Sequence, residues 1–417
     1  MTDLITGAQA ALFARDQDAR PFRQAFVVVL DGDITAQQVC WRVAGRLPAR
    51  FRQQPSGWPV QSWADDPLFD LQGHVRHTQL ARGQSLEAWI ERRLAMPSDR
   101  AHPLWQVWLV GLPASELKAL VVFCHPALVD AGEHVHLLDC LADSQPGEIA
   151  PVPLASPAAA DAPQGWTWGD DPASTWSGLS ASVGGMVDTA LRAVTERPAE
   201  FQVAGVEVPL DDVRAVARAF GCTVHDVVVA LAAGGVAAIG VAGDVAAAGP
   251  PQPQPDPVAV DPLAFSAGGA RRVEPVRMTL PVGVAGAGDR LDAIATLTRA
   301  ELDAGGRVPA LELVGPGMGV ATCHALAAQS LADAGAHTAV VAHAPGTREQ
   351  WFVGLAAVRG VTAFLTPTND ETLTVCATGH GPSITLGATG LAPLAGFGRG
   401  VLDGLDTLVS LAGRRRS

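Results

Sequence analysis

The sequence predicts an α/β protein built from two subdomains, and three observations lead to this fold class. The chain has 417 residues, enough for two domains with sizeable hydrophobic cores. Short apolar runs alternate with segments in which apolar residues recur at helical spacing. A stretch rich in Pro, Ala, Ser, Asp and Trp interrupts this alternation. We therefore expect an N-terminal subdomain at residues 1–143, a crossover linker at 144–177 and a C-terminal subdomain at 178–417.

The N-terminal subdomain is predicted to carry three strands and two helices. Ala25–Leu30 is a short apolar run bounded by charge and turn residues, which is typical of a buried strand. Gln106–Val110 and Ala119–Cys124 follow as two strands separated by a turn. Ser85 is a suitable cap for a helix that reaches Leu94, and a second helix is predicted at His134–Leu141.

The C-terminal subdomain contains a proline-rich insert, Gly243–Gly269, which we expect to be a mobile surface loop. Val227–Val241 is predicted to be a packed core helix, and Val401–Leu411 an amphipathic helix close to the chain end. The last two predicted strands flank Gly379–Pro382 and indicate a hairpin. The strand candidates are Arg277–Val284, His337–His343, Trp351–Val358, Leu373–Thr378 and Ser383–Thr389.

Composition restricts the classes of function. The formal charge of -13 argues against nucleic acid as the main partner. The six cysteines are scattered without a C-x-x-C pair, which favours reduced thiols in a cytoplasmic protein and no metal site. The N-terminal segment lacks the pattern of a secretion signal, and no uncharged apolar segment reaches the length of a membrane span.

The most informative segment is Leu120–Gly132, where a predicted strand ends. It is close to the catalytic pattern H-H-x-x-x-D-G, in which the second His removes a proton from an acceptor hydroxyl or amine. His125 occupies the first position, Pro126 the second and Asp130 the acidic position, while Ala131 replaces the glycine. A pyrrolidine ring can neither accept nor donate a proton, so the usual general base is missing from this position.

Four further blocks accompany this motif in the same order as in one known family. They are Asp66–Arg76 (D-P-L-F-D-L-Q-G-H-V-R), Asp99–Trp108 (D-R-A-H-P-L-W-Q-V-W), Val224–Val228 (V-H-D-V-V) and Ala344–Arg348 (A-P-G-T-R). With these blocks the chain resembles the bacterial wax ester synthase/diacylglycerol acyltransferase family. That family is similar to chloramphenicol acetyltransferase-like and condensation-domain folds. The resemblance implies an α/β (α+β sandwich) architecture with an active-site tunnel between two such subdomains.

The resemblance also implies a function and its partners. An acyl group would pass from acyl-CoA, or from a carrier-protein thioester, to an alcohol acceptor such as diacylglycerol or a fatty alcohol. Acyl-CoA would be a co-substrate, with no further cofactor. The resemblance also implies that the protein forms a homo- or heterodimer and associates with the surface of a membrane or lipid droplet. The implied substrate-binding residues are Pro103, Leu104, Trp105, Asp226, Pro345 and Gly346.

Two other polar positions depart from the family pattern. His225 stands where the family has the Asn of N-D, and His343 stands where Asn precedes V-P-G. Thr223 and Asp226 have the spacing of a capping box, which places His225 in the first turn of a helix. The positive helix end disfavours imidazolium, so a neutral His225 could replace the lost base, although a hydrogen-bonding role near the cap is an alternative.

The remaining candidates also leave alternatives open. His125 could be a relocated base or a buried structural histidine, and Asp130 an ion-pair partner for an arginine. Cys124 and Cys222 flank the two motifs as thiols, either nucleophilic or simply packed. The whole chain could be an active acyltransferase or a catalytically impaired paralogue that binds acyl-CoA, lipid or a partner acyltransferase. A condensing or cyclising enzyme of a specialised metabolite pathway is the third reading.

Overall fold

The computed structural model divides into two compact units, which are described separately below. The first comprises residues 1–200, 268–272 and 349–361, and the second comprises 201–267, 273–348 and 362–417. The structure describes residues 3–5, 7–57, 62–113, 115–128, 137–147, 200–246, 258–267, 270–303, 308–309, 339–347, 349–367, 373–391 and 393–416. The predicted linker at 144–177 lies outside these residues from position 148 onward.

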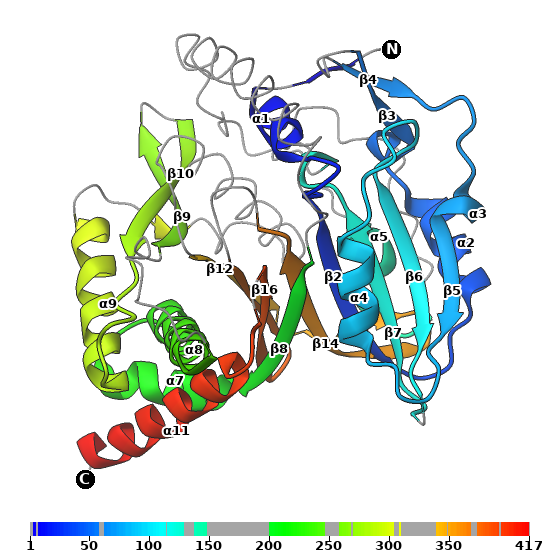
Figure 1. Ribbon diagram of the computed structural model, residues 1–417. Coiled ribbons are helices and arrows are strands. Elements are labelled where there is room, and N and C mark those ends of the chain that lie inside the picture. Colours follow the sequence, from blue (N-terminus) through cyan, green and yellow to red (C-terminus); the bar gives the residue numbers. More distant parts are fainter. Residues whose placement is uncertain are drawn as a thin grey trace. The chain divides into compact units, whose positions relative to one another are not determined.

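The first unit is organised around a six-stranded sheet of order β13-β14-β2-β7-β6-β5 (Figure 1). Its central strands β2 (Gln24–Asp31), β7 (Lys118–Cys124) and β6 (Trp105–Gly111) are antiparallel neighbours, whereas β5 (Val75–Gln79) runs parallel to β6. The three strands predicted for this part of the chain are therefore confirmed. Apolar residues on β7 are almost completely inaccessible to solvent, which identifies this strand as the centre of the core.

Smaller elements surround this sheet. Its last strands are β13 (Phe352–Val353) and β14 (Ala356–Leu365), and a separate three-stranded sheet contains β1 (Asp3–Leu4), β4 (Ser62–Asp65) and β3 (Gln53–Ser56). The helices are α1 (Gly7–Arg15), α2 (Ala36–Arg46), α3 (Leu71–His74), α4 (Leu86–Leu94) and α5 (Leu137–Leu141). The predicted cap of α4 is confirmed, because Ser85 Oγ accepts a hydrogen bond from the Ala88 amide at 3.1 Å.

The second unit contains a seven-stranded mixed sheet. The main path is β10-β9-β12-β15-β16-β8, and β11 (Val308–Pro309) pairs with β9. The predicted hairpin is confirmed as β15 (Leu373–His380) and β16 (Ser383–Gly390), and Gly381 takes a φ of 54° in its turn. The other strands are β8 (Gln202–Pro209), β9 (Val258–Ala267), β10 (Ala270–Thr279) and β12 (Ala339–Thr347).

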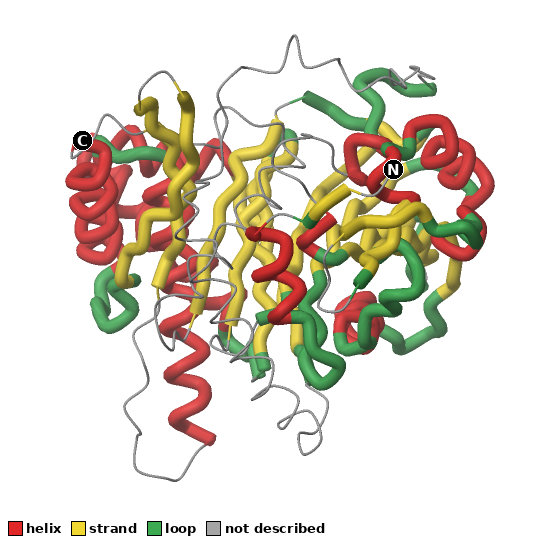
Figure 2. Tube along the Cα trace, turned by 90° about the horizontal axis from the view of Figure 1, so that it is seen from above, coloured by secondary structure: helices red, strands yellow, loops and turns green. Residues whose placement is uncertain are grey.

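Helices α7 (Leu210–Phe220), α8 (Val224–Ala246) and α11 (Phe397–Arg416) pack together beside this sheet, and α9 (Ala287–Asp303) packs against α8 (Figures 1 and 2). Glycines allow the close crossing of α8 and α11, since a Cβ at Gly400 would lie 2.6 Å from Gly234 O. Among the described helices, none is by itself both long and apolar enough to cross a membrane. Only α7 and the first part of α8, taken together, reach the length and apolar composition of a membrane span, and the chain bends by 108° between them.

Three sequence predictions differ from the structure. The insert at 243–269 was wrongly expected to be a surface loop throughout, since α8 continues to Ala246 and β9 begins at Val258. Trp351–Val358 was predicted as one strand, but Gly354, with a φ of 68°, turns the chain between β13 and β14. The strand predicted at Arg277–Val284 lies earlier, in β10. In each case the end of a strand or helix was misplaced. The partner strand decides where a strand begins and ends, and the local sequence does not show that partner.

The domain division from sequence also differs. It assigned all of residues 178–417 to the C-terminal subdomain, whereas residues 178–200, 268–272 and 349–361 belong to the first unit. For residues 349–361 the reason is the pairing of β13 and β14 within the six-stranded sheet. This return of the chain is a non-local pairing, which local sequence patterns do not report.

Candidate functional site

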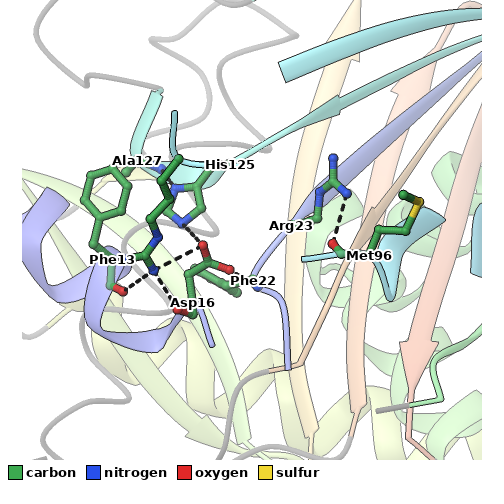
Figure 3. A network of polar contacts seen from close by, with 8 residues as sticks. Phe13, Asp16, Phe22, Arg23, Met96, His125 and Ala127 are labelled. Atoms are coloured by element: carbon green, nitrogen blue, oxygen red, sulfur yellow. Dashed lines mark hydrogen bonds and ion pairs between the residues drawn. The ribbon is translucent and has the colours of Figure 1, made fainter. Parts of the chain in front are cut away.

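His125 follows β7 directly and is anchored by its own backbone. Its amide donates to Leu104 O at 2.9 Å, and its carbonyl accepts from the Leu128 amide at 3.0 Å. The ring is 1% exposed and stacks on Phe13, with 4.7 Å between the ring centroids (Figure 3). The edge of Phe22 covers it from another direction, at 6.2 Å. His125 is therefore enclosed within the first unit.

The hydrogen bonds of His125 indicate its tautomer. The Ala127 amide donates to His125 Nδ1 at 3.0 Å, so Nδ1 carries the lone pair and the proton lies on Nε2. Nε2 points towards Asp16 Oδ2, 3.7 Å away (Figure 3). Burial lowers the pKa of His125 to about 4, and the attraction of Asp16 opposes this effect only in part. The ring is thus neutral near pH 7, and its lone pair is already used.

Asp16 and Arg100 complete this cluster, and the sequence analysis did not assign either of them. Asp16 Oδ1 accepts from the Phe22 amide at 2.9 Å, while Arg100 Nη2 donates to Asp16 O at 2.7 Å. Arg100 belongs to the block Asp99–Trp108, and its place in that block is the only sequence signal that could have indicated a role. The cluster ties α1 to the loop that follows β7.

Pro126 begins a short 3-10 turn, Pro126–Leu128, and is buried. The first position of a helical turn suits proline, because the amide there needs no intrahelical acceptor. The structure thus gives a local reason for proline at this position, and the imidazole of the resembling motif is absent. Asp130 and Ala131, the rest of the motif, lie outside the described residues.

The first two family blocks are brought together in the first unit. His102 Nδ1 lies 3.1 Å from Asp66 Oδ2, and His74 Nδ1 lies 2.8 Å from Trp105 O. The indole of Trp105 donates to Phe51 O at 2.7 Å and stacks on His74. Pro103, Leu104 and Trp105, the proposed substrate contacts, are all buried. These blocks hold each other in place, and a substrate contact by Trp105 stays a prediction.

The capping box at the start of α8 is confirmed. The Asp226 amide donates to Thr223 Oγ1 at 3.1 Å, and Asp226 Oδ2 accepts from the Thr223 amide at 2.8 Å. The Thr223 hydroxyl also donates to Asp226 Oδ2 at 2.7 Å. Asp226, one of the predicted substrate-binding residues, is thus engaged in fixing the helix start. His225 lies in the first helical turn, as the spacing predicted.

His225 lies against His343 of β12. The two Nδ1 atoms are 3.1 Å apart, and the rings are stacked with 5.3 Å between centroids. One Nδ1 must carry a proton and the other a lone pair for this contact to be attractive. Burial, and then the neighbouring His225, lower the pKa of His343 well below its usual value. His343 is therefore neutral near pH 7 and is suited to the acceptor role.

Sequence reasoning noted these two histidines as separate departures and missed their contact. Both replace asparagines of the family pattern, and that parallel change was the available signal. Pro345 and Gly346 follow His343 on the same strand, β12. The structure thus brings His225 and residues Ala344–Thr347 of the last family block to adjoining elements of the second unit, whereas His125 belongs to the first.

The two flanking thiols are poor nucleophiles in this structure. Burial raises the pKa of the Cys124 thiol to about 12, and Cys124 Sγ lies 3.7 Å from Gln24 Oε1. Burial, followed by Asp226, raises the pKa of Cys222 to about 11. In the part of the chain that the structure describes, no three His, Cys, Asp or Glu side chains are grouped as a metal site.

Comparison with solved structures identifies the class of fold. A wax ester synthase/diacylglycerol acyltransferase from Marinobacter aquaeolei VT8 matches with a TM-score of 0.68 and 20% identity, covering 98% of this chain and 100% of that one. The first condensation domain of the calcium-dependent antibiotic synthetase matches with a TM-score of 0.52 and 15% identity, covering 100% and 97%. The predicted fold class, that of chloramphenicol acetyltransferase-like and condensation-domain proteins, is confirmed.

Comparison of sequences shows similarity to one family over part of the chain. Residues 34–203 match the wax ester synthase/diacylglycerol acyltransferase catalytic domain. The putative diacylglycerol O-acyltransferase Rv3371 of Mycobacterium tuberculosis is 31% identical over 188 residues, which cover 40% of each protein. The probable diacylglycerol O-acyltransferase tgs1 of that species is 28% identical over 249 residues, 54% of this chain and 51% of the relative. The resemblance is confirmed for residues 34–203, which are similar to the wax ester synthase/diacylglycerol acyltransferase catalytic domain. The matched regions span about half the length of these curated relatives or less.

Proposed function

We propose that the protein transfers an acyl group from a CoA or carrier-protein thioester to an alcohol such as diacylglycerol or a fatty alcohol. The observation that carries this proposal is the match of residues 34–203 to the acyltransferase catalytic domain. The interlocked blocks around Trp105 support it, because they retain the framework of that domain. Acyl-CoA would be a co-substrate, and the reaction needs no other cofactor. Peripheral contact with a membrane or lipid droplet, and a dimer, belong to the same proposal.

The reaction requires one proton to leave the acceptor and one to reach the leaving group. The acceptor hydroxyl loses its proton to a base while its oxygen attacks the thioester carbonyl carbon. The C–S bond then breaks, and the CoA thiolate takes the proton back from the base. The products are an ester and free CoA, so acid and base can be the same imidazole.

His225 is the residue that we assign as this base. When its Nδ1 proton is donated to His343 Nδ1, the lone pair of His225 lies on Nε2, the atom that would receive the acceptor's proton. The neutral His343 can accept this hydrogen bond, because one of its ring nitrogens carries a lone pair. His125 is less suited, because its Nδ1 already accepts from the Ala127 amide. Asp130 keeps its proposed role as an ion-pair partner for an arginine.

A second function is favoured by one observation, the proline at position 126. A protein that has lost its principal base can retain the fold for binding acyl-CoA, lipid or a partner acyltransferase. This impaired paralogue would bind the thioester without consuming it. A condensing or cyclising reaction has weaker support, because the likeness to condensation domains concerns the fold alone.

The discriminating experiment combines the purified chain with palmitoyl-CoA and either hexadecanol or dioleoylglycerol. Release of free CoA together with an ester product, detected by a thiol reagent and mass spectrometry, is expected. If no CoA is released while palmitoyl-CoA raises the Tm, the binding function replaces catalysis. If neither release nor stabilisation occurs with folded protein, both functions are excluded.

A further inference from the structure

A cluster of arginines and tryptophans lies at the C-terminal end of α4, within the first unit. The guanidinium of Arg93 lies 4.0 Å above the ring centroid of Trp108 and 5.3 Å from that of Trp89. Arg76, which neighbours Trp108 in the pairing of β5 and β6, reaches the same indole at 5.6 Å. Two guanidinium groups therefore converge on one aromatic ring.

The positive charges of Arg76 and Arg92 lie close enough to Arg93 to repel it. Burial lowers the pKa of Arg93, followed by repulsion from Arg76 and Arg92, and no attractive charge is among the causes. Within the described part of the chain, none of these three arginines forms an ion pair. Such a grouping is unusual in a protein with a formal charge of -13.

The negative C-terminal end of α4 does not explain why these positively charged arginines gather there. The carbonyl oxygens at the end of α4 attract cations, but Arg23 already donates to Met96 O at 3.1 Å (Figure 3). Arg23 also donates to Arg93 O at 3.0 Å. Arg76 Nε donates to Gly73 O at 2.8 Å, which leaves its two Nη groups as donors. A guanidinium group over an indole keeps N–H groups that can donate to other acceptors, and their forked arrangement fits phosphate oxygens.

We propose that Arg76 and Arg93, which lie over Trp108, form with the nearby Arg92 a binding site for a phosphate-bearing anion. Contact with the indole restricts the two guanidinium groups before binding, so less side-chain entropy is lost when the anion arrives. The shared chemistry is a phosphate group, supplied either by a free phosphate compound or by a phospholipid headgroup. The proposal does not depend on acyl transfer, and its test contains no catalytic step.

The test titrates the full chain with inorganic pyrophosphate and with phosphatidylcholine vesicles containing phosphatidate, following tryptophan fluorescence and calorimetry. Arg93→Gln and Arg76→Gln are each expected to weaken binding by about tenfold, the loss typical of one charge-assisted hydrogen bond. Arg82→Gln is the matched control, because it removes the same charge from an exposed position before the start of α4. Binding should also weaken as salt is raised.

The outcomes separate the two sources of phosphate. Pyrophosphate binding that depends on Arg76 and Arg93 supports a site for a free phosphate compound. Binding to phosphatidate vesicles alone, with the same dependence, supports a lipid headgroup. Absence of both, or an equal loss with Arg82→Gln, overturns the site. If Arg93→Gln does not fold, the exposed Arg76→Gln provides the decisive comparison.

Discussion

His225 Nδ1 lies 3.1 Å from His343 Nδ1, although the two residues are 118 positions apart in the chain. Each occupies a position where the resembling family has asparagine. Since the two rings are in contact, the two departures change one place in the second unit. A pair of imidazoles can hold and pass a proton, which a pair of amides cannot do near neutral pH.

His225→Asn is therefore expected to lower the rate of CoA release by about 100-fold or more, the usual contribution of a general base. His343→Asn should lower the rate of CoA release by less and shift its pH dependence, because it changes only the hydrogen-bond partner of His225 Nδ1. His77→Asn, at an exposed position on β5, is the control. Unchanged rates in both variants of the pair, with an unchanged Tm, would exclude His225 as the base.

His125 is expected to make stability depend on pH. Its pKa is about 4 in the folded protein and about 6.5 when unfolded, so between these values the unfolded chain binds more protons. The contribution of His125 to the free energy of unfolding should be complete above pH 6.5. It should fall by about 3 kcal/mol as the pH is lowered to 4. Urea unfolding across this range, compared with His125→Asn, measures the difference.

His125→Asn is chosen because an amide oxygen can still accept from the Ala127 amide while the titrating group is removed. The variant should lose some stability at pH 7 but show a flatter pH dependence than the parent. Parallel curves for the two proteins would mean that His125 titrates normally and is not enclosed as described.

The central strands of both sheets could be predicted from sequence because they are short, buried apolar runs, as in Ala25–Leu30 and Leu373–Thr378. Caps were equally accessible, since Ser85 and Thr223 act on residues only three positions away. The pairing of β14 with the sheet of the first unit was not predictable, because it depends on long-range packing. The enclosure of His125 by Phe13 and Asp16 depends on the same kind of contact.

Asp143 offers a test of a buried ion pair that the sequence did not indicate. Its side chain is inaccessible and lies 2.6 Å from Arg42 Nη1 and 2.7 Å from Arg46 Nη1. Its Oδ2 also accepts from the Gly354 amide at 3.1 Å, which links α2 to the hairpin of β13 and β14. The ion pair predicted for Asp130 stays a prediction, because Asp130 lies outside the described residues.

Asp143→Asn should destabilise the protein by about 3–5 kcal/mol, because two arginines lose the charge that compensates their burial. Asp33→Asn removes a carboxylate that is 95% exposed and paired with Lys118, so a loss below about 1 kcal/mol is expected. Chemical unfolding of the two variants side by side measures the contrast. Similar losses would show that the buried pair contributes no more than a surface pair.

Pro126→His restores the imidazole that the resembling motif carries at this position. Proline favours the folded state by restricting the unfolded chain, so the substitution should cost about 0.4–1 kcal/mol of stability. If the acyl transfer site is otherwise intact, CoA release should rise by about 100-fold or more, since the new side chain can remove the acceptor's proton.

Pro126→Ala is the matched control, because it has the same backbone effect without a titrating group. A comparable gain with alanine would attribute the effect to the backbone of the turn Pro126–Leu128 rather than to proton transfer. No gain from either variant, in a protein whose activity is lost with His225→Asn, would show that the base has moved permanently to the second unit.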